Sequence, residues 1–261
     1  MKILDSDIEI IQKFLIENFQ DPFAGNLTDF ATKGSKFIRS KLALLYFKAQ
    51  GVVLNEELYN ILAIGELIHN ASLLQDDVLD NAEERRGVST FYKKYDSKIA
   101  VLAGDYLLTH AIKKLININN IEIFNIFQNC IQQMTKAEIN QYFLKSKIPT
   151  KEQYLEICKG KTAQLFIAIL ESCAILLNLN KATASKFAEL FGIYFQINND
   201  LETKSMEQDK SNEIYTANNV LGIEKTRILL DNYKEEMRGI LSDFPDNIYK
   251  QNLEDLVNNL W

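Results

Sequence analysis

The sequence predicts a mostly α-helical protein, and two observations favour that class. Only 3 of the 261 residues are proline and 10 are glycine, so long stretches contain no residue that interrupts a helix. Within these stretches apolar residues recur every three or four positions, as expected where one helix face packs on a core. A chain of this length, 47% hydrophobic, can form one large core or two small ones. We expect a single domain over residues 1–261, without internal repeats or linkers.

Composition and charge argue against several classes of function. The net charge of -6 and the absence of a Lys/Arg cluster give no electrostatic basis for binding nucleic acid. No apolar run of about 18 residues spans a bilayer, and the N-terminus turns acidic too early for a secretory signal. We therefore expect a cytoplasmic protein with no stable membrane insertion. Cys130, Cys158 and Cys173 are odd in number and far apart, which predicts buried thiols rather than a disulfide framework or a zinc site.

The N-terminal third is expected to begin with a peripheral helix over residues 6–19, with Ser6 as a possible N-cap. Pro22 and Gly25 mark a break, and a second apolar helix is expected over residues 42–50. Lys36 and Arg39 lie at its start. Free backbone N–H groups and the helix dipole would add to their charge, so this start could hold an anion. A solvated helix start is the alternative.

Residues 59–84 contain no proline and one glycine, and we expect them to form a long helix that carries Asp76, Asp77 and Asp80. Positions one turn apart share a face, so Asp76 and Asp80 should point together, with Asp77 at the edge of that face. Carboxylates this close repel, by about 4 kcal/mol per pair at 4 Å with an effective dielectric near 20. Oxygen ligands without nearby His or Cys favour a hard cation, and this pattern predicts Mg²⁺.

Two arginines follow this acidic cluster. Arg85 and Arg86 carry guanidinium groups, whose geometry suits phosphate oxygens, so together with the cation they predict a bound polyphosphate. The alternative is a solvated acidic helix end, in which Glu83 and Glu84 pair with the arginines.

The remaining chain continues the helical pattern over residues 98–118, 121–144, 222–241 and 249–261. Another helix should start after Thr150, a plausible N-cap. Within it, Gly160, Lys161 and Thr162 interrupt an apolar run. Such a triplet is either a kink with a solvated lysine or part of a functional site.

The segment from His69 to Gly87, with DDxxD at residues 76–80 and RRG at 85–87, resembles the first aspartate-rich motif of the trans-polyprenyl diphosphate synthases. The resemblance spans roughly residues 30 to 230. It implies the isoprenoid synthase fold, an all-α single-domain bundle of about ten or more helices around a central substrate cavity. It also implies a homodimer that uses Mg²⁺ to condense isopentenyl diphosphate with an allylic diphosphate, with the released diphosphate as the base for proton loss.

The resemblance assigns roles to three further sets of residues. Isopentenyl diphosphate would be held by cations that match the family's binding residues: Lys36, Arg39, His69 and Arg86. The allylic diphosphate would be contacted by Arg85 and Lys161. The oxygens of Thr162 and Gln196 would stabilise the carbocation as it forms.

The second aspartate-rich motif departs from the family pattern. Residues 195–203 align with FQxxDDxxD, so Asn199 and Thr203 stand where aspartate is usual, and Asp200 keeps its carboxylate. We expect Asp200 and Asn199 to ligate a metal ion more weakly than the usual pair, because an amide compensates less charge. The loop that follows, residues 204–211, also lacks the usual insert.

Product length follows from the residues that precede Asp76. Positions four and five residues earlier, Ser72 and Ala71, lie about 6 to 7.5 Å along the helix, with Ile68 or Leu67 a further turn away. In the family, bulky aromatic residues there stop chain growth early. Two small residues at these positions would leave room for a longer chain, so the resemblance predicts a medium or long product, roughly C30 or longer.

Three alternatives remain for the activity. One is a short-chain farnesyl or geranylgeranyl diphosphate synthase. A second is a catalytically weak, prenyl-diphosphate-binding subunit of a heteromeric synthase, which Asn199 and Thr203 would suit. A terpene cyclase is the third, and Lys36, Arg39 and Arg86 disfavour it because they would serve a second diphosphate.

Overall fold

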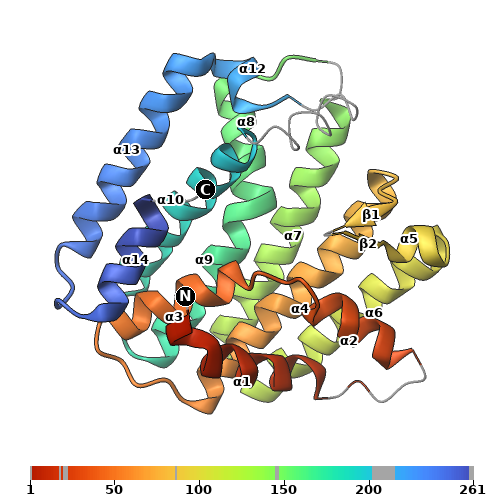
Figure 1. The fold of residues 1–261 in the computed structure, drawn as a ribbon, viewed down its shortest axis with the longest axis horizontal. Helices are drawn as coiled ribbons and strands as arrows, with labels where there is room; N and C mark the ends of the chain where they lie inside the picture. Colours follow the sequence, from red (N-terminus) through yellow and green to blue (C-terminus); the bar gives the residue numbers. More distant parts are fainter. Residues whose placement is uncertain are drawn as a thin grey trace. The chain divides into compact units, whose positions relative to one another are not determined.

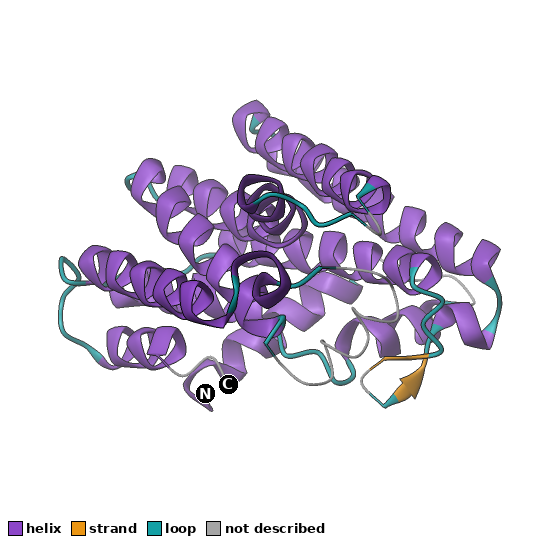
Figure 2. Cartoon of the chain, turned by 90° about the horizontal axis from the view of Figure 1, so that it is seen from above, coloured by secondary structure: helices purple, strands orange, loops and turns teal. Residues whose placement is uncertain are grey.

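The computed structural model describes residues 2–17, 19, 23–85, 87–144, 147–201 and 215–258. Helices make up most of this part of the chain (Figure 1), which confirms the predicted all-α class. The strands that it contains form one short antiparallel hairpin, visible in Figure 2. In these ranges, no helix combines the length and the apolar character needed to cross a lipid bilayer.

The chain divides into two compact units, which we describe separately. Unit 1 comprises Met1–Leu44 and Leu54–Phe124, and unit 2 comprises Leu45–Val53 and Asn125–Trp261. The expectation of one domain over residues 1–261 stays a prediction.

Unit 1 begins with a short 3-10 turn and then two helices. Its elements in chain order are η1 (Lys2–Leu4), α1 (Asp5–Ile16), α2 (Ala24–Thr32), the start of α3 (Ile38–Ala49), α4 (Glu56–Leu79), β1 (Glu84–Arg85), β2 (Val88–Ser89), α5 (Phe91–Lys94) and α6 (Ser97–Ile118). Two expectations were wrong here. Leu4, not Ser6, occupies the N-cap of α1, without a side-chain cap. The break expected at Gly25 is instead the first turn of α2.

The central helix of unit 1 is α4, which packs mainly on α6 and α1. Its start is fixed by Asn55, whose side chain accepts a hydrogen bond from the Leu58 N–H at 3.0 Å. The negative charges of Glu56 and Glu57 in the first turn also stabilise the helix, because they lie at the positive end of its dipole. The predicted range 59–84 was too long at its end. The helix stops at Leu79 because Asn81 takes a left-handed conformation, with φ of 50°, and the chain turns into the hairpin.

Unit 2 is built from the remaining helices: α7 (Ile121–Phe143), α8 (Lys151–Cys158), the π-helical turn η2 (Lys159–Ala163), α9 (Gln164–Leu176), α10 (Lys181–Asn199), α12 (Ala217–Leu221), α13 (Ile223–Leu241) and α14 (Ile248–Asn258). The helices predicted over 121–144 and 222–241 are confirmed within a residue or two. Thr150 forms the predicted cap, and its capping box with Gln153 is complete. Residues 259–261 of the last predicted helix lie outside the described ranges.

The core of unit 2 forms around α10, which packs on α9, η2 and α13. Its contact with η2 depends on Gly192, since a Cβ there would lie only 2.4 Å from the Ala163 Cα. Interiors are too densely packed to absorb such an overlap. The three cysteines are buried, as predicted, and burial raises the pKa of the Cys158 and Cys173 thiols above its ordinary value.

Candidate active site

The end of α4 presents two half-buried carboxylates, those of Asp76 and Asp80. Although the regular helix ends at Leu79, the Asp80 N–H still donates to the Asp76 carbonyl oxygen at 2.8 Å. The helical spacing therefore continues through Asp80, and residues four apart at this spacing lie on one side. This backbone spacing is compatible with a pair of cation ligands.

Asp77, between them, is turned into the protein and is 0% exposed. Its Oδ1 lies 2.7 Å from the Nε of Arg85, whose side chain is 27% exposed. Asp77 as a further metal ligand and Arg85 as a contact of the allylic diphosphate both stay predictions. In this structure, however, the two side chains pair with each other.

The hairpin that follows is fastened to this turn by backbone groups. The Ala82 N–H donates to the Asp77 carbonyl oxygen at 2.8 Å, and the Thr90 hydroxyl donates to the Ala82 carbonyl oxygen at 2.6 Å. Arg85 pairs with Val88 across the hairpin. Arg86, predicted to bind isopentenyl diphosphate, lies outside the described residues.

The other cations predicted to bind isopentenyl diphosphate lie in the same unit. Lys36 is exposed just before α3, Arg39 is half-buried in its first turn, and His69 is half-buried on α4. The Ser40 hydroxyl donates to the buried Glu66 carboxylate at 2.6 Å, which ties the start of α3 to α4. The roles of Lys36, Arg39 and His69 stay predictions.

The residues predicted to control chain length lie on α4. Ala71 and Ile68 are each 3% exposed, and Ser72 is half-buried with its hydroxyl bonded to the His69 carbonyl oxygen at 2.8 Å. A Cβ on Gly104 would lie 3.2 Å from the Ala71 carbonyl oxygen. Gly104 thus permits the close approach of α6 to α4, and Figure 1 shows these helices side by side.

In unit 2, Lys161 and Thr162 lie in the π-helical turn η2, the position where the sequence predicted either a kink or a site. Single π-turns within α-helices are frequent at functional sites. Gly160 allows this turn to approach α7, because a Cβ there would lie 2.4 Å from the Ala137 Cβ.

The Lys161 ammonium group is held by two side chains of α7. Its Nζ lies 2.8 Å from Oε1 of Glu138 and donates to Oε1 of Gln141 at 2.5 Å. The Lys161 side chain is 25% exposed, so this cation is fixed in place and partly open to solvent. Its predicted contact with the allylic diphosphate is untested.

A chain of hydrogen bonds connects Thr162 to the end of α10. The Thr162 hydroxyl donates to Oε1 of Gln196 at 2.5 Å, and the Gln196 amide donates to Oδ1 of Asp200 at 2.8 Å. The Tyr154 hydroxyl donates to the other oxygen, Oδ2, at 2.5 Å. Tyr154 was not among the predicted residues, and no contiguous motif in the sequence marks it, since its acceptor lies 46 residues further along the chain.

The pKa of the Asp200 carboxyl is raised from its ordinary value, chiefly because burial disfavours the charged form. The hydrogen bonds from Tyr154, Gln196 and the Ala217 backbone N–H, and the charge of Lys161, oppose this shift without cancelling it. Burial also raises the pKa of the Tyr154 hydroxyl. Tyr154 therefore stays protonated at neutral pH and acts as a donor.

The two acidic motifs differ in how well they fit a metal ion. Within the described ranges, no three His, Cys, Asp or Glu side chains form a metal-binding group. Asp76 and Asp80 nevertheless suit Mg²⁺, which proteins often hold with one or two carboxylates plus substrate phosphates. At the second motif, Asn199 offers a neutral amide and Asp200 is occupied by other donors, so the fit is poor. Thr203 and the loop at 204–211 lie outside the described residues.

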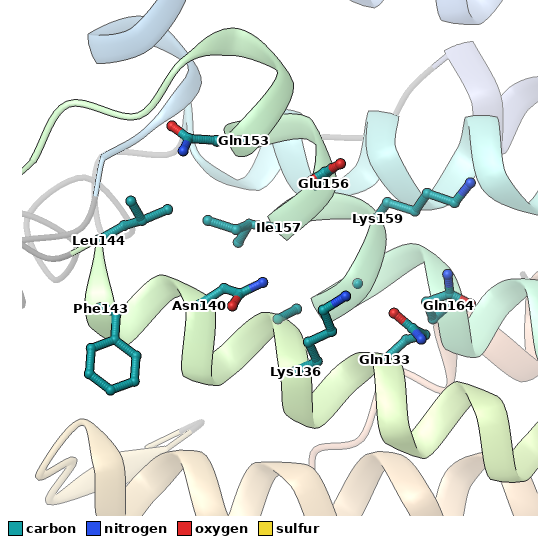
Figure 3. Close-up of a pocket in the computed structure, with 12 residues that line it drawn as sticks. Gln133, Lys136, Asn140, Phe143, Leu144, Gln153, Glu156, Ile157, Lys159 and Gln164 are labelled. Carbon is teal, nitrogen blue, oxygen red and sulfur yellow. The ribbon is translucent and has the colours of Figure 1, made fainter.

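A cavity of about 500 Å³ lies elsewhere in unit 2, between α7 and the α8–η2–α9 segment. Figure 3 shows Lys136 and Asn140 on one side of it, with Gln153, Glu156 and Ile157 on the other. None of the residues that line it is a predicted site residue, and no sequence motif marks it.

Residues 21–217 match the polyprenyl synthetase family, and the chain belongs to this family. A prenyl transferase of Cyanidium caldarium is 34% identical over 173 residues, which cover 64% of this chain and 54% of that protein. An all-trans-nonaprenyl-diphosphate synthase of Rhodobacter capsulatus is 31% identical over 179 residues, covering 67% and 55% of the two chains. The chain thus spans about half the length of the curated relatives it matches.

One solved structure agrees with this family assignment, and a second shares the fold. A geranyltranstransferase of Thermotoga maritima is 30% identical, with a TM-score of 0.81 over 97% of this chain and 93% of that one. A decaprenyl diphosphate synthase of Rhodobacter capsulatus has a TM-score of 0.88 over 98% and 96% of the two chains. At 23% identity, the second likeness shows the fold alone.

Proposed function

We propose that this protein is an Mg²⁺-dependent prenyltransferase that condenses isopentenyl diphosphate with an allylic diphosphate. One observation carries the proposal: a chain of the polyprenyl synthetase family keeps two half-buried carboxylates, Asp76 and Asp80, one turn apart at the end of α4. The cation bound there would neutralise a diphosphate leaving group, which lowers the barrier to heterolysis of the allylic C–O bond.

The remaining roles follow the family resemblance and are proposals for this chain. Arg85 and Lys161 would hold the allylic diphosphate, and Lys161 is already supported by Glu138. Lys36, Arg39, His69 and Arg86 would hold isopentenyl diphosphate so that its double bond meets the cation. Thr162 and Gln196 present oxygens to a developing positive charge, and their mutual hydrogen bond favours a fixed orientation.

We propose a medium or long product. The small size of Ala71 and Ser72 supports it, as do relatives whose names specify long products, including the nonaprenyl synthase and a solanesyl diphosphate synthase of Arabidopsis thaliana. The short-chain alternative is favoured by the geranyltranstransferase structure. Ala71→Phe should shorten the product seen by chromatography, whereas Ser89→Phe, at an exposed hairpin position, should not. An unchanged distribution for Ala71→Phe would argue against α4 as the wall that limits length.

The direct test uses the purified protein with Mg²⁺, farnesyl diphosphate and radiolabelled isopentenyl diphosphate. Elongated products that require both Mg²⁺ and isopentenyl diphosphate support the proposal. Absence of elongation by the homomer would favour a catalytically weak subunit of a heteromeric synthase, for which Asn199 is the supporting observation. Turnover of the allylic substrate without isopentenyl diphosphate would favour a terpene cyclase.

We also propose that the protein forms a homodimer. Support comes from α6, on which Leu102 and Ile116 are 61% and 62% exposed and lie two heptads apart, so they share one face. Exposed apolar faces of this kind commonly mark interfaces. Leu102→Lys combined with Ile116→Lys should convert the dimer to monomer in sedimentation analysis, while the same change at Val53, 89% exposed, should not.

A further inference from the structure

We propose that Asp200 is a positioning residue that orients Gln196 and Thr162, that Tyr154 holds it in place, and that it does not ligate a metal ion. This inference rests on the proposed function, because it assigns the role of one acidic residue in that reaction. It departs from the metal-binding role that the family resemblance suggests.

The first support is that both oxygens of the buried Asp200 carboxylate already accept hydrogen bonds from the protein. Three neutral donors reach it: the Tyr154 hydroxyl at 2.5 Å, the Gln196 amide at 2.8 Å and the Ala217 backbone N–H. A carboxylate has about four acceptor positions, and this side chain is only 5% exposed. A divalent ion would compete with these donors for a carboxylate that has little access to solvent, and a buried donor that it displaced would be costly to leave unpaired.

The second support is the position of Asp200 among the elements of unit 2. Its three donors come from α8, from α10 and from the first residue of α12. The carboxylate thus connects three helices, whereas a metal ligand at a substrate site must leave an open side for the substrate phosphates. Asp200 therefore has a structural role in unit 2, where it links α8, α10 and α12.

The third support is what the carboxylate does to Gln196. The Gln196 side chain is fixed at both ends, because its N–H donates to Asp200 and its oxygen accepts from Thr162. Asp200 can accept but not donate in its charged form, so it selects the amide orientation that turns Oε1 toward Thr162. Without Asp200, the amide could rotate and present its N–H group, whose partial positive charge would destabilise a carbocation.

Asn199, the neighbouring residue, stands at the other aspartate position of the second motif and is not one of the donors to Asp200. It is half-buried and offers one neutral oxygen. Tyr154→Phe and Asp200→Asn should therefore impair catalysis without altering metal binding, which separates positioning from ligation.

The test compares three variants with the wild type: Tyr154→Phe, Asp200→Asn and Tyr46→Phe. The last removes another buried tyrosine hydroxyl of unit 2 and serves as the control. Mn²⁺ binding is measured by electron paramagnetic resonance without substrate, and kcat and KM are measured for the condensation. We expect Tyr154→Phe and Asp200→Asn to bind Mn²⁺ within twofold of wild type and to lose about tenfold in kcat with little change in KM, as for one lost hydrogen bond that acts in the transition state.

A tenfold loss of Mn²⁺ affinity in Asp200→Asn alone would overturn the inference and leave the proposed function intact. If condensation is not detected, urea unfolding decides. Tyr154→Phe and Asp200→Asn should then be strongly non-additive in the double variant, as coupled partners are. Additive changes in the free energy of unfolding would show that Tyr154 does not hold Asp200 in place, and would overturn the inference.

Discussion

The ends of α4 and α10 are alike in backbone and opposite in chemistry. Each helix closes on an aspartate whose N–H bonds back one turn, Asp80 to Asp76 at 2.8 Å and Asp200 to Gln196 at 3.1 Å. A carboxylate at a helix C-terminus is disfavoured by the negative end of the dipole, so each end needs compensation. At the end of α4 the buried Asp77 receives a guanidinium, whereas Asp200 receives neutral donors only.

The difference has a physical consequence for each motif. With Asp77 paired to Arg85, Asp76 and Asp80 add two carboxylates at a half-buried surface, which favours a cation there. At α10, neutral donors cannot offset the cost of burial, and the pKa of Asp200 rises. On the proposed function, one helix end would bind a cation and the other would hold side chains in position, although both belong to aspartate-rich motifs.

The strongest way to break this comparison is to remove a carboxylate from the α4 end. Asp76→Ala should lower kcat/KM for the condensation about 1,000-fold, because the cation supplies several kcal/mol of charge stabilisation. Steady-state assays with labelled isopentenyl diphosphate measure the loss. Glu83→Ala is the matched control, since this exposed carboxylate pairs only with Lys93 in the contacts described, and it should stay within twofold. Equal losses in both variants would contradict a special role for Asp76.

Removing the compensating charge tests the same end by stability. Arg85→Met leaves Asp77 buried without its guanidinium, and should lower the free energy of unfolding by about 3 kcal/mol. Lys93→Met breaks the exposed pair with Glu83, whose side chains are 51% and 67% exposed, and should cost less than about 1 kcal/mol. Urea denaturation followed by circular dichroism separates the two, and similar costs would mean that Asp77 does not depend on Arg85.

In unit 2, close packing between η2 and α7 should contribute strongly to stability. Gly160→Ala places a Cβ 2.4 Å from the Ala137 Cβ and should destabilise unit 2 by about 2 kcal/mol. Gly239→Ala, on α13 with nothing within 4 Å, should instead stabilise by up to about 1 kcal/mol. Thermal unfolding measures both. A neutral Gly160→Ala would show that α7 can move away from η2.

The smallest expected effect is a change in metal affinity at the end of α10. Asn199→Asp restores a carboxylate beside Asp200 and should strengthen Mn²⁺ binding about threefold to tenfold, because affinity follows the number of charged ligands. Asn198→Asp adds the same charge about 100° around the helix and should change the affinity less. Isothermal titration with Mn²⁺ gives both values, and an equal gain would indicate a general field effect instead of ligation by residue 199.

Much of the fold was predictable because its signals are local. The apolar period predicted the helices over 98–118 and 121–144, and Thr150 marked a helix start through its capping box. The end of α4 was missed because it depends on the left-handed conformation of Asn81. An asparagine can adopt this conformation but does not require it, so its presence in the sequence does not mark a helix end. The helix α2 was missed because proline and glycine usually interrupt helices, so Pro22 and Gly25 predicted a loop at this position.

The candidate site was predictable to the extent that its motifs are contiguous. Asp76 and Asp80 follow from spacing alone, and the polar interruption at Lys161 and Thr162 predicts a kink or a site where the structure has the π-helical turn η2. Tyr154 gave no such signal, because nothing near it in the sequence names Asp200 as its acceptor.

The sequence by itself determined the helical class, the acidic motif on α4 and the loss of a carboxylate at Asn199, since each is written in residue types at short spacing. Tertiary structure decided which aspartates turn inward. Asp200 meets a hydroxyl 46 residues away in the chain, and only the packing of α8, α10 and α12 brings the two together. Burial and hydrogen-bond partners set what a carboxylate can do, and both are properties of the folded chain.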